Sequence, residues 1–271
     1  MTGRSAALLS WYRTSHRPLP WRATSDPYRI LVSEVMLQQT QAARVVPAYE
    51  RFLERFPTAS ALAAAPLGDV LDAWQGLGYP NRARRLREAA ALVTGGGWPA
   101  TAAGLEALPG VGPYTAAAVA SFAFGARAAA LDTNARRVLG RWHGRPLSGA
   151  DLKQVGAAEL PDDAAAWNQA VMELGATLCR PRAPRCAECP VATWCADPGV
   201  YVPPPRQARY RGSLRQVRGD VLRSLSGGGA AGIDEIATTT RHDRDRVAEA
   251  VASLRRDGLV TQGPGGARIA R

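Results

Sequence analysis

The sequence predicts an all-α body followed by a small helical module near its C-terminal end. Apolar residues recur at helical spacing between proline and glycine breaks, and the body contains no convincing alternation of apolar and polar residues that would predict a strand. A proline run at 202–205 then separates a tail of different composition. With 271 residues and 46% hydrophobic content, the chain is long enough for two or three compact units.

The first helix predicted in the body has a clear start signal. Asp26 is a favourable N-cap and Pro27 suits the first turn, and apolar residues follow at helical spacing across 28–41. Further body helices are predicted over residues 48–55, 67–75, 81–93, 113–124, 133–142 and 164–178. A proline-rich loop that contains every cysteine of the chain follows the last of them.

The tail carries a local excess of positive charge, with 13 Arg against 7 Asp and Glu residues over 205–271. Three helices are predicted in it, over 217–225, 233–237 and 244–256. They are followed by Leu259-Val260, a turn at Gly265-Gly266, and Arg268-Ile269. This order of elements resembles a winged-helix module.

The charge of the whole chain favours an anionic partner. The net charge is +11, and Lys153 is the sole lysine among 34 basic residues. A general preference for Arg over Lys would explain why lysine is so rare, but it would not explain the positive charge, because exchanging one for the other leaves the net charge unchanged. No basic amphipathic helix or lipidation signal stands out, so we favour nucleic acid over a membrane surface. The uncharged run over 107–126 opens with prolines and glycines that break a helix, and it does not predict a membrane span.

The cysteines predict a metal centre. Cys179, Cys186, Cys189 and Cys195 are separated by six, two and five residues. Thiolates gathered so closely favour a shared iron-sulfur cluster or a zinc ion, and we favour a [4Fe-4S] cluster. Zinc sites usually have two Cys-x2-Cys pairs, and disulfides are typical of small secreted domains. With no targeting segment evident, reduced thiols agree with a cytoplasmic location, which would be nucleoid-associated in a prokaryote.

A glycine-containing hairpin lies between two of the predicted helices. Residues 108–115 read Leu-Pro-Gly-Val-Gly-Pro-Tyr-Thr, and Gly110 and Gly112 permit a tight turn before the second helix. Backbone N–H groups in such a turn, together with the helix N-terminus, can hold a DNA phosphate without reading sequence. Taken alone, the segment is more simply an ordinary helix-helix turn. However, Leu131-Asp132-Thr133-Asn134 and then the cysteines follow it.

The hairpin, the downstream Asp132 and the cysteine loop together resemble the helix-hairpin-helix DNA glycosylases of the endonuclease III superfamily, over about residues 8–200. Within that superfamily, the chain is most similar to the MutY-type adenine glycosylases. This similarity rests on residues 19–22, 26–28, 33–41, 76–79 and 168–175.

The resemblance implies a division of the chain into domains. It predicts a six-helix barrel with the hairpin over 19–125 and a [4Fe-4S] cluster domain formed by 1–18 and 126–202. A linker and the winged-helix-like module would occupy 203–271. Many relatives carry a Nudix-like domain that helps recognise 8-oxoguanine, and this tail is too short for one.

The resemblance also implies roles for two carboxylates. Release of adenine needs a proton on the purine and an anion near the oxocarbenium-like sugar. Glu34 would be the acid, and its place in an apolar helix should raise its pKa. Asp132 would stabilise the sugar, and backbone N–H groups at a helix start should keep it ionised. Taken alone, Glu34 could lie on a solvated helix face and Asp132 could be a simple N-cap.

The residue at position 114 separates two types of reaction. Related bifunctional lyases have a lysine there, which attacks C1′ and forms a Schiff base. This chain has Tyr114, and Lys153 is distant in sequence, so we expect hydrolysis by water with little or no lyase activity. The resemblance implies that Tyr114 hydrogen-bonds near Asp132 and that Asn134 orders Glu34 or the water.

The adenine must leave the duplex before it can react. The resemblance assigns the wedge that enters the duplex to Gln39 and Tyr79. It places Trp21, Arg22, Leu37 and Glu173 in the adenine pocket. The DNA-contacting residues would be Gln38, Gln39, Thr40, Tyr79, Gly110, Val111, Gly112 and Thr115. The cluster would fold a loop whose Arg180, Arg182 and Arg185 face the phosphate backbone, and a redox-sensing role stays open.

We therefore expect a monofunctional glycosylase that removes adenine opposite 8-oxoguanine or guanine, acting as a monomer on double-stranded DNA in base excision repair. One alternative is a thymine or uracil glycosylase acting on G mismatches, because Tyr114 and Asp132 also occur in such relatives. Glu34 and the glutamines after it favour adenine. Another is a non-catalytic iron-sulfur regulator, against which both carboxylates argue.

Overall fold

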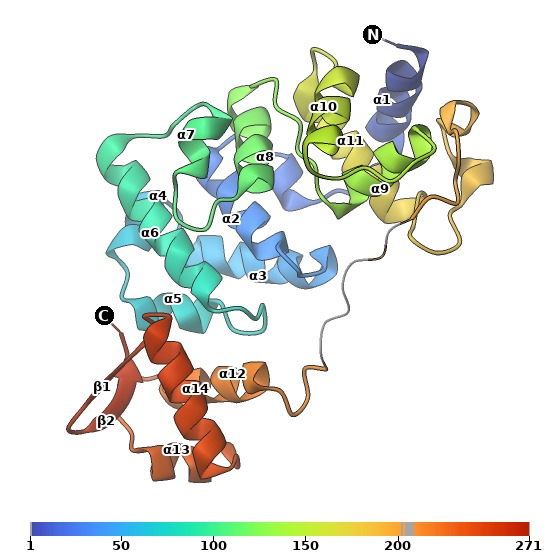
Figure 1. Ribbon diagram of the computed structural model, residues 1–271. Helices are drawn as coiled ribbons and strands as arrows, with labels where there is room; N and C mark the ends of the chain where they lie inside the picture. Colours follow the sequence, from blue (N-terminus) through green and yellow to red (C-terminus); the bar gives the residue numbers. More distant parts are fainter. Residues whose placement is uncertain (1, 202, 204–208, 271) are drawn as a thin grey trace. The chain divides into compact units, whose positions relative to one another are not determined.

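The structure is a computed structural model that describes residues 2–201, 203 and 209–270. Within these residues the body is helical throughout, and the strands lie only in the tail. The prediction of an all-α body is therefore confirmed. The body helices are α1 Gly3–Ser15, α2 Pro27–Leu37, α3 Ala42–Arg55, α4 Ala59–Ala64, α5 Leu67–Ala73, α6 Asn81–Gly96, α7 Ala102–Glu106, α8 Pro113–Phe124, α9 Thr133–Trp142, α10 Gly149–Glu159 and α11 Ala164–Thr177 (Figure 1).

The predicted bounds of α8 and α9 agree with the structure. Among the predicted helices, α2 and α3 differ most from their expected bounds. Helix α2 ends at Leu37, before the predicted end at 41, because Gln39 adopts a left-handed backbone with φ 59°. Helix α3 begins at Ala42, before the predicted start at 48, and continues through Pro47, a residue type that usually breaks a helix. Burial of the apolar face of α3 outweighs the hydrogen bond that Pro47 cannot donate.

Helices α1, α4, α7 and α10 were not predicted. Three of them begin with a threonine cap that could have identified them. The side chains of Thr2, Thr58 and Thr101 each accept a hydrogen bond from a backbone N–H in the first turn.

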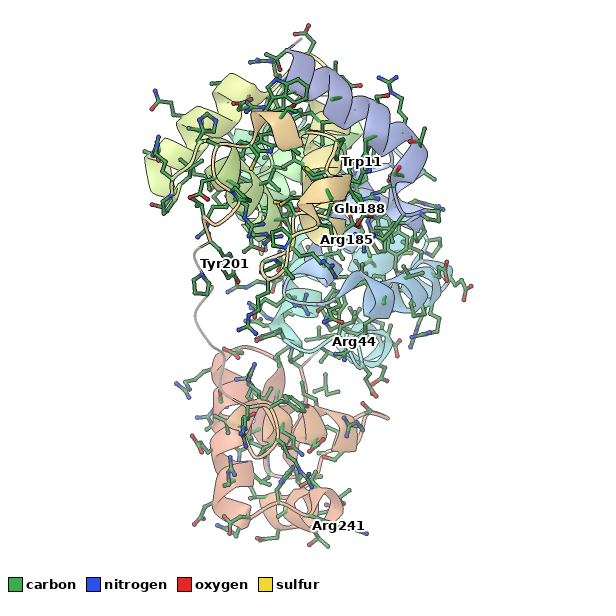
Figure 2. All side chains as sticks on the ribbon, turned by 90° about the vertical axis from the view of Figure 1, so that its right-hand side faces the viewer. Trp11, Arg44, Arg185, Glu188, Tyr201 and Arg241 are labelled. Carbon is green, nitrogen blue, oxygen red and sulfur yellow. The ribbon has the colours of Figure 1, made fainter. Side chains whose placement is uncertain are left out.

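The chain divides into two compact units, and the first comprises residues 1–34 and 98–205. Its main core joins α1, α9 and α11 around Leu8, Leu139 and Trp167, which are almost fully buried. Trp11 on α1 packs against the edge of this core (Figure 2). Helix α11 also packs against α8, so α8, α9 and α11 form the framework that carries Tyr114, Asp132 and Glu173.

The second unit comprises residues 35–97 and 206–271. Helices α4 and α5 pack against α6, and the rings of Phe52 and Trp74 meet edge to face with centroids 5.8 Å apart. The tail module contains α12 Leu214–Ser224, α13 Ile233–Thr240, α14 Arg244–Arg256, and the antiparallel strands β1 Val260–Gly263 and β2 Gly266–Ile269 (Figure 1). This is the winged-helix order that the sequence predicts.

The compact units follow packing, and they do not coincide with the boundaries predicted near residues 18, 125 and 202. Those domain boundaries stay a prediction. Of the predicted linker 202–205, only Pro203 is among the described residues. None of the helices described here is both long enough and apolar enough to cross a bilayer.

Candidate active site

Glu34 lies in the middle of α2 with only 4% of its surface exposed. Burial is the largest influence and raises the pKa of this carboxyl to about 7; a hydrogen bond from Tyr114 opposes the shift, and the negative charge of Asp132 adds to it. The oxygen Oε2 is buried and has no hydrogen-bond partner among the described residues. Glu34 can therefore hold a proton near neutral pH on a carboxyl with one uncommitted oxygen. The raised pKa that the apolar helix predicts is confirmed.

Asp132 is the N-cap of α9. Its Oδ1 accepts a hydrogen bond of 2.6 Å from the backbone N–H of Ala135, and its Oδ2 accepts one of 2.7 Å from Asn134 Nδ2. Desolvation by the surrounding protein raises the pKa of Asp132, although these donors act in the opposite direction. The predicted capping bond is present, but its effect on the pKa is smaller than that of burial. That Asp132 is ionised stays a prediction.

Tyr114 lies in the first turn of α8. Its hydroxyl hydrogen-bonds with Glu34 and is 3.3 Å from Met172 Sδ. Burial raises its pKa well above 10, and the charges of Glu34 and Asp132 raise it further, so the phenol stays neutral. The hydrogen bond expected near Asp132 is thus made to Glu34, while Asp132 interacts with Tyr114 only through its charge.

Asn134 orders Asp132 and has no bond to Glu34 in the structure. Its Oδ1 accepts a hydrogen bond of 2.8 Å from Arg137 Nη2. Arg137 is buried and also donates to the carbonyls of Gly175, at 2.7 Å, and Cys179, at 2.8 Å. Arg137 was not predicted as a site residue. Its only signal was a position one helical turn after Asn134.

The close approach of α9 and α11 depends on Gly175. A Cβ atom at this position would lie 2.6 Å from Asn134 Cβ, which is closer than packed side chains allow. Asn168, on the same helix, is buried and accepts a hydrogen bond of 3.0 Å from the N–H of Ala130. Its Nδ2 donates to the Ala128 carbonyl at 2.8 Å. Asn168 therefore fixes the segment that leads into Asp132, whereas Gly175 lets α11 approach the first turn of α9. Neither role was predicted from the sequence.

The residues predicted for the adenine pocket include a buried ion-pair network. Glu173 is fully buried and accepts hydrogen bonds from Arg17 Nε at 2.7 Å and Arg22 Nη2 at 2.8 Å. Burial alone would raise the pKa of Glu173, but the bonds from Arg17 and Arg22 lower it to about 2. Trp21 is buried on the short 3₁₀ turn Pro20–Arg22. Leu37 is half-buried at the end of α2 and belongs to the second compact unit.

The hairpin between α7 and α8 has the predicted tight turn. Gly110 has φ 79°, Val111 is buried, and Gly112 is the N-cap of α8. Gly112 has φ −91°, and a Cβ built on it would meet no atom within 4 Å. Packing inside the protein therefore does not require glycine at this position. The side chain of Thr115 is buried, so any contact of Thr115 with DNA would be made by its backbone.

The two predicted wedge residues both have a left-handed backbone conformation, which is uncommon for residues other than glycine. Gln39 is exposed with φ 59°, and Tyr79 is 36% exposed with φ 48°. Gln38 and Thr40 are half-buried, and Thr40 Oγ1 donates to the Leu77 carbonyl at 3.3 Å. All four residues lie in the second compact unit. In the same unit, Arg215 of the tail module donates to the Tyr79 hydroxyl at 3.0 Å.

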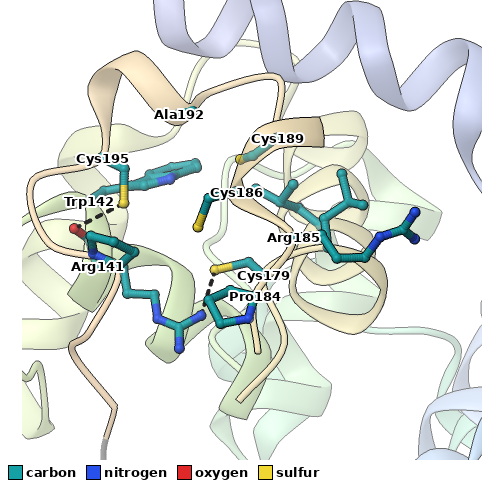
Figure 3. A pocket seen from close by; sticks show the side chains of 12 residues that line it. Arg141, Trp142, Cys179, Pro184, Arg185, Cys186, Cys189, Ala192 and Cys195 are labelled. Atoms are coloured by element: carbon teal, nitrogen blue, oxygen red, sulfur yellow. Dashed lines mark hydrogen bonds between the residues drawn. The ribbon is translucent and has the colours of Figure 1, made fainter. Parts of the chain in front are cut away.

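The four cysteines line a single cavity of about 170 Å³ (Figure 3). Arg141 is almost fully buried beside it, and its Nη1 donates to Cys179 Sγ at 3.1 Å and to the Arg180 carbonyl at 2.9 Å. Burial raises the pKa of Cys189 and Cys195, and the neighbouring thiols raise it further. Across the described residues, no three His, Cys, Asp or Glu side chains are grouped so that they could hold one metal ion.

The arginines of the cysteine loop are exposed, as the sequence predicts. Arg180, Arg182 and Arg185 lie on its surface. Arg185 Nε donates to Glu188 Oε1 at 2.6 Å, and the two side chains lie beside each other (Figure 2). Figure 3 shows Arg185 extending away from the cysteine sulfurs.

The chain is similar to a family of DNA repair proteins and to several adenine DNA glycosylases. Residues 32–152 match the family model of the HhH-GPD superfamily base excision DNA repair proteins. The chain is 45% identical over 275 residues to an adenine DNA glycosylase of Mycobacterium tuberculosis (strain H37Rv), covering 94% of this chain and 89% of that protein. It is 46% identical to an adenine DNA glycosylase of Mycolicibacterium smegmatis, with 94% and 92% covered. The human adenine DNA glycosylase is 40% identical, with 89% of this chain and 45% of that protein covered.

Two solved structures support the fold. A thermostable thymine-DNA glycosylase superposes with a TM-score of 0.67 and 32% identity, covering 71% of this chain and 93% of that chain. A non-covalent endonuclease III-DNA complex superposes with a TM-score of 0.62 and 25% identity, covering 73% and 97%.

Proposed function

Because the chain belongs to the adenine DNA glycosylases of the HhH-GPD superfamily, we propose that it removes adenine mispaired with 8-oxoguanine or guanine from double-stranded DNA, as a monomer, in base excision repair. The observation that carries this proposal is the buried carboxyl of Glu34. Its pKa is near neutrality and its Oε2 has no partner among the described residues, so it suits the protonation of a purine.

The proposed reaction begins after the adenine has left the duplex. Glu34 gives its proton to N7, the bond between N9 and C1′ breaks with its electrons moving to the purine, and adenine leaves neutral. The carboxylate of Asp132 stabilises the positive charge that develops on the sugar. Water then adds to C1′ and loses a proton to the Glu34 carboxylate. The product is an abasic site, and Glu34 is again protonated.

Two features support hydrolysis without strand cleavage. Strand cleavage through a Schiff base needs an amine at C1′. The hairpin position that faces Glu34 holds Tyr114, whose phenol stays neutral. The only lysine, Lys153, is exposed on α10.

The cysteine loop fits a [4Fe-4S] cluster. Four thiols line one cavity, and only Cys186 and Cys189 have the Cys-x2-Cys spacing that is usual in zinc sites, which favours a [4Fe-4S] cluster. Cys179, Cys186, Cys189 and Cys195 would be its ligands. When bound, the cluster would supply a rigid cross-link that holds the loop, while the exposed arginines of that loop would contact phosphate groups.

Base release from four duplexes tests the proposed function. These carry adenine opposite 8-oxoguanine, adenine opposite guanine, thymine opposite guanine, and uracil opposite guanine. We expect release of adenine, and strand breaks only after alkali treatment. Asp132→Asn should abolish release while retaining DNA binding. The two pyrimidine duplexes are included because a solved thymine-DNA glycosylase is similar to this chain. Preferential release of a pyrimidine would refute the adenine assignment.

A further inference from the structure

One arginine of the second compact unit contacts the backbone beside each of the two predicted wedge residues, Gln39 and Tyr79. Arg82 lies in the first turn of α6 and is half-buried. Its Nη1 donates to the carbonyls of Val35, Met36 and Gln38 at 2.6, 3.1 and 2.7 Å. Its Nη2 donates to the carbonyls of Leu77 and Gly78 at 2.9 and 3.1 Å and to Thr40 Oγ1 at 3.3 Å. A single guanidinium thus joins the end of α2 to the loop before α6.

These contacts include the peptide groups next to the two left-handed residues. The Gln38 carbonyl immediately precedes Gln39, which has φ 59°. The Gly78 carbonyl immediately precedes Tyr79, which has φ 48°. Residues other than glycine adopt this backbone rarely and keep it only where the surroundings hold it. Arg82 holds the orientation of both peptide groups at once.

The aromatic contacts of Arg82 add to this restraint. Its guanidinium carbon is 5.4 Å from the centroid of the Trp74 ring and 5.6 Å from that of the Tyr79 ring. Trp74 is buried, and its Nε1 donates to the Gly78 carbonyl at 3.1 Å. The Nε of Arg82 is buried with no hydrogen-bond partner among the described residues, so the restraint comes from Nη1, Nη2 and the ring contacts. Tyr79 is therefore held through both its backbone and its ring.

We propose that Arg82 is a positioning residue that holds Gln39 and Tyr79 in the conformation in which they enter the duplex and displace the mispaired base. This inference rests on the proposed function, because only an enzyme that extrudes a base needs such a wedge. The role requires a planar fork with several donors, which lysine does not have. Arg82→Lys would keep the charge and lose most of the contacts.

A purely structural role makes a different prediction. If Arg82 only stabilised the fold, its replacement would lower the unfolding temperature and weaken all DNA binding equally. A positioning role predicts selective loss of the steps that unstack a base. A duplex with a tetrahydrofuran abasic analogue in place of the adenosine has no base to extrude, so it separates the two roles.

The test compares Arg82→Met and Arg82→Lys with Arg85→Met, an exposed arginine on the same helix. Adenine release is measured in single turnover below the unfolding temperature of each variant. Base unstacking is followed by the fluorescence of 2-aminopurine placed beside the adenine. For both Arg82 variants we expect about a tenfold or greater loss of release and a weaker fluorescence change, with affinity for the abasic duplex within about threefold of wild type. Arg85→Met should behave as wild type in all three measurements.

Two outcomes would overturn the inference. One is release within about twofold of wild type by a folded Arg82 variant. The other is an equal loss of affinity for the mismatched and the abasic duplex. If Arg82→Met does not fold, the same three measurements on Arg82→Lys decide between the two roles. Failure of the wild-type protein to release adenine would instead refute the proposed function, and the fluorescence change, which requires no chemistry, would still report on Arg82.

Discussion

The hydroxyl of Tyr114 hydrogen-bonds with the carboxyl group of Glu34, and the Oε2 atom of that carboxyl has no partner in the described part of the chain. One side of Glu34 is thus held by the hairpin helix α8, and the oxygen on the other side is buried with no partner among the described residues. The two residues are 80 positions apart in sequence, and the fold brings them together without a lysine. This pairing is the basis for the first two predictions.

Base release should require protonated Glu34 and should therefore decline above neutral pH. Burial raises the pKa of Glu34 to about 7, so the protonated fraction falls as the pH rises through that value. We expect the single-turnover rate to fall by about tenfold per pH unit once the pH exceeds about 8, and Glu34→Gln to be slower by about 10² to 10⁴. Rates measured between about pH 5.5 and 9 check this. A flat wild-type profile over that range would contradict the acid role.

Glu34→Gln should also stabilise the protein at alkaline pH. The pKa of Glu34 is 4.5 when exposed and about 7 in the fold, so the folded state favours the protonated form. The contribution of Glu34 to stability is complete below pH 4.5 and is lost as the pH rises through about 7. At about 1.4 kcal/mol per pKa unit, the variant should gain on the order of 3 kcal/mol near pH 8 and little near pH 4. Urea unfolding at several pH values tests this, with Glu50→Gln, an exposed position, as the control.

Gly112→Ala should weaken DNA binding without destabilising the protein. The backbone at Gly112 suits any residue, and the added methyl group would meet no atom within 4 Å. We expect a free energy of unfolding within about 1 kcal/mol of wild type, and about a tenfold loss of affinity for DNA because the methyl group would separate the hairpin backbone from the phosphates. Gly95→Ala, which also has open space around it, is the matched control. Unchanged DNA affinity would argue that the hairpin backbone does not approach DNA.

Arg215→Met should slow base release although Arg215 lies in the tail module. Its Nη1 donates to the Tyr79 hydroxyl at 3.0 Å, so the module anchors the tip of the predicted wedge. Loss of one hydrogen bond of this kind should reduce the rate of release by about three- to tenfold. Arg223→Met, which removes an exposed arginine from the same helix, controls for the lost charge. Equal rates for the two variants would show that the contact with Tyr79 is irrelevant to release.

Much of the fold and part of the site could be read from the sequence because the signals are local. Pro113 and Asp132 mark the starts of α8 and α9, and both helices begin where predicted. The apolar neighbours of Glu34 along α2 predicted its burial and its raised pKa. The spacing of the cysteines predicted that they would line one cavity.

What the sequence by itself determined was the helical body, the hairpin, the cysteine loop and the carboxylate that holds a proton. Only the tertiary structure decided that Asn134 orders Asp132 and that Arg22 is paired with a buried Glu173. It also decided that Arg82 joins the segment that holds Gln39 to the one that holds Tyr79. These arrangements depend on contacts between segments far apart in the chain, such as Arg22 and Glu173, 151 residues apart. Helical periodicity and caps act over a few residues and constrain local structure, whereas the partner of a buried charge is set by which distant segments pack together.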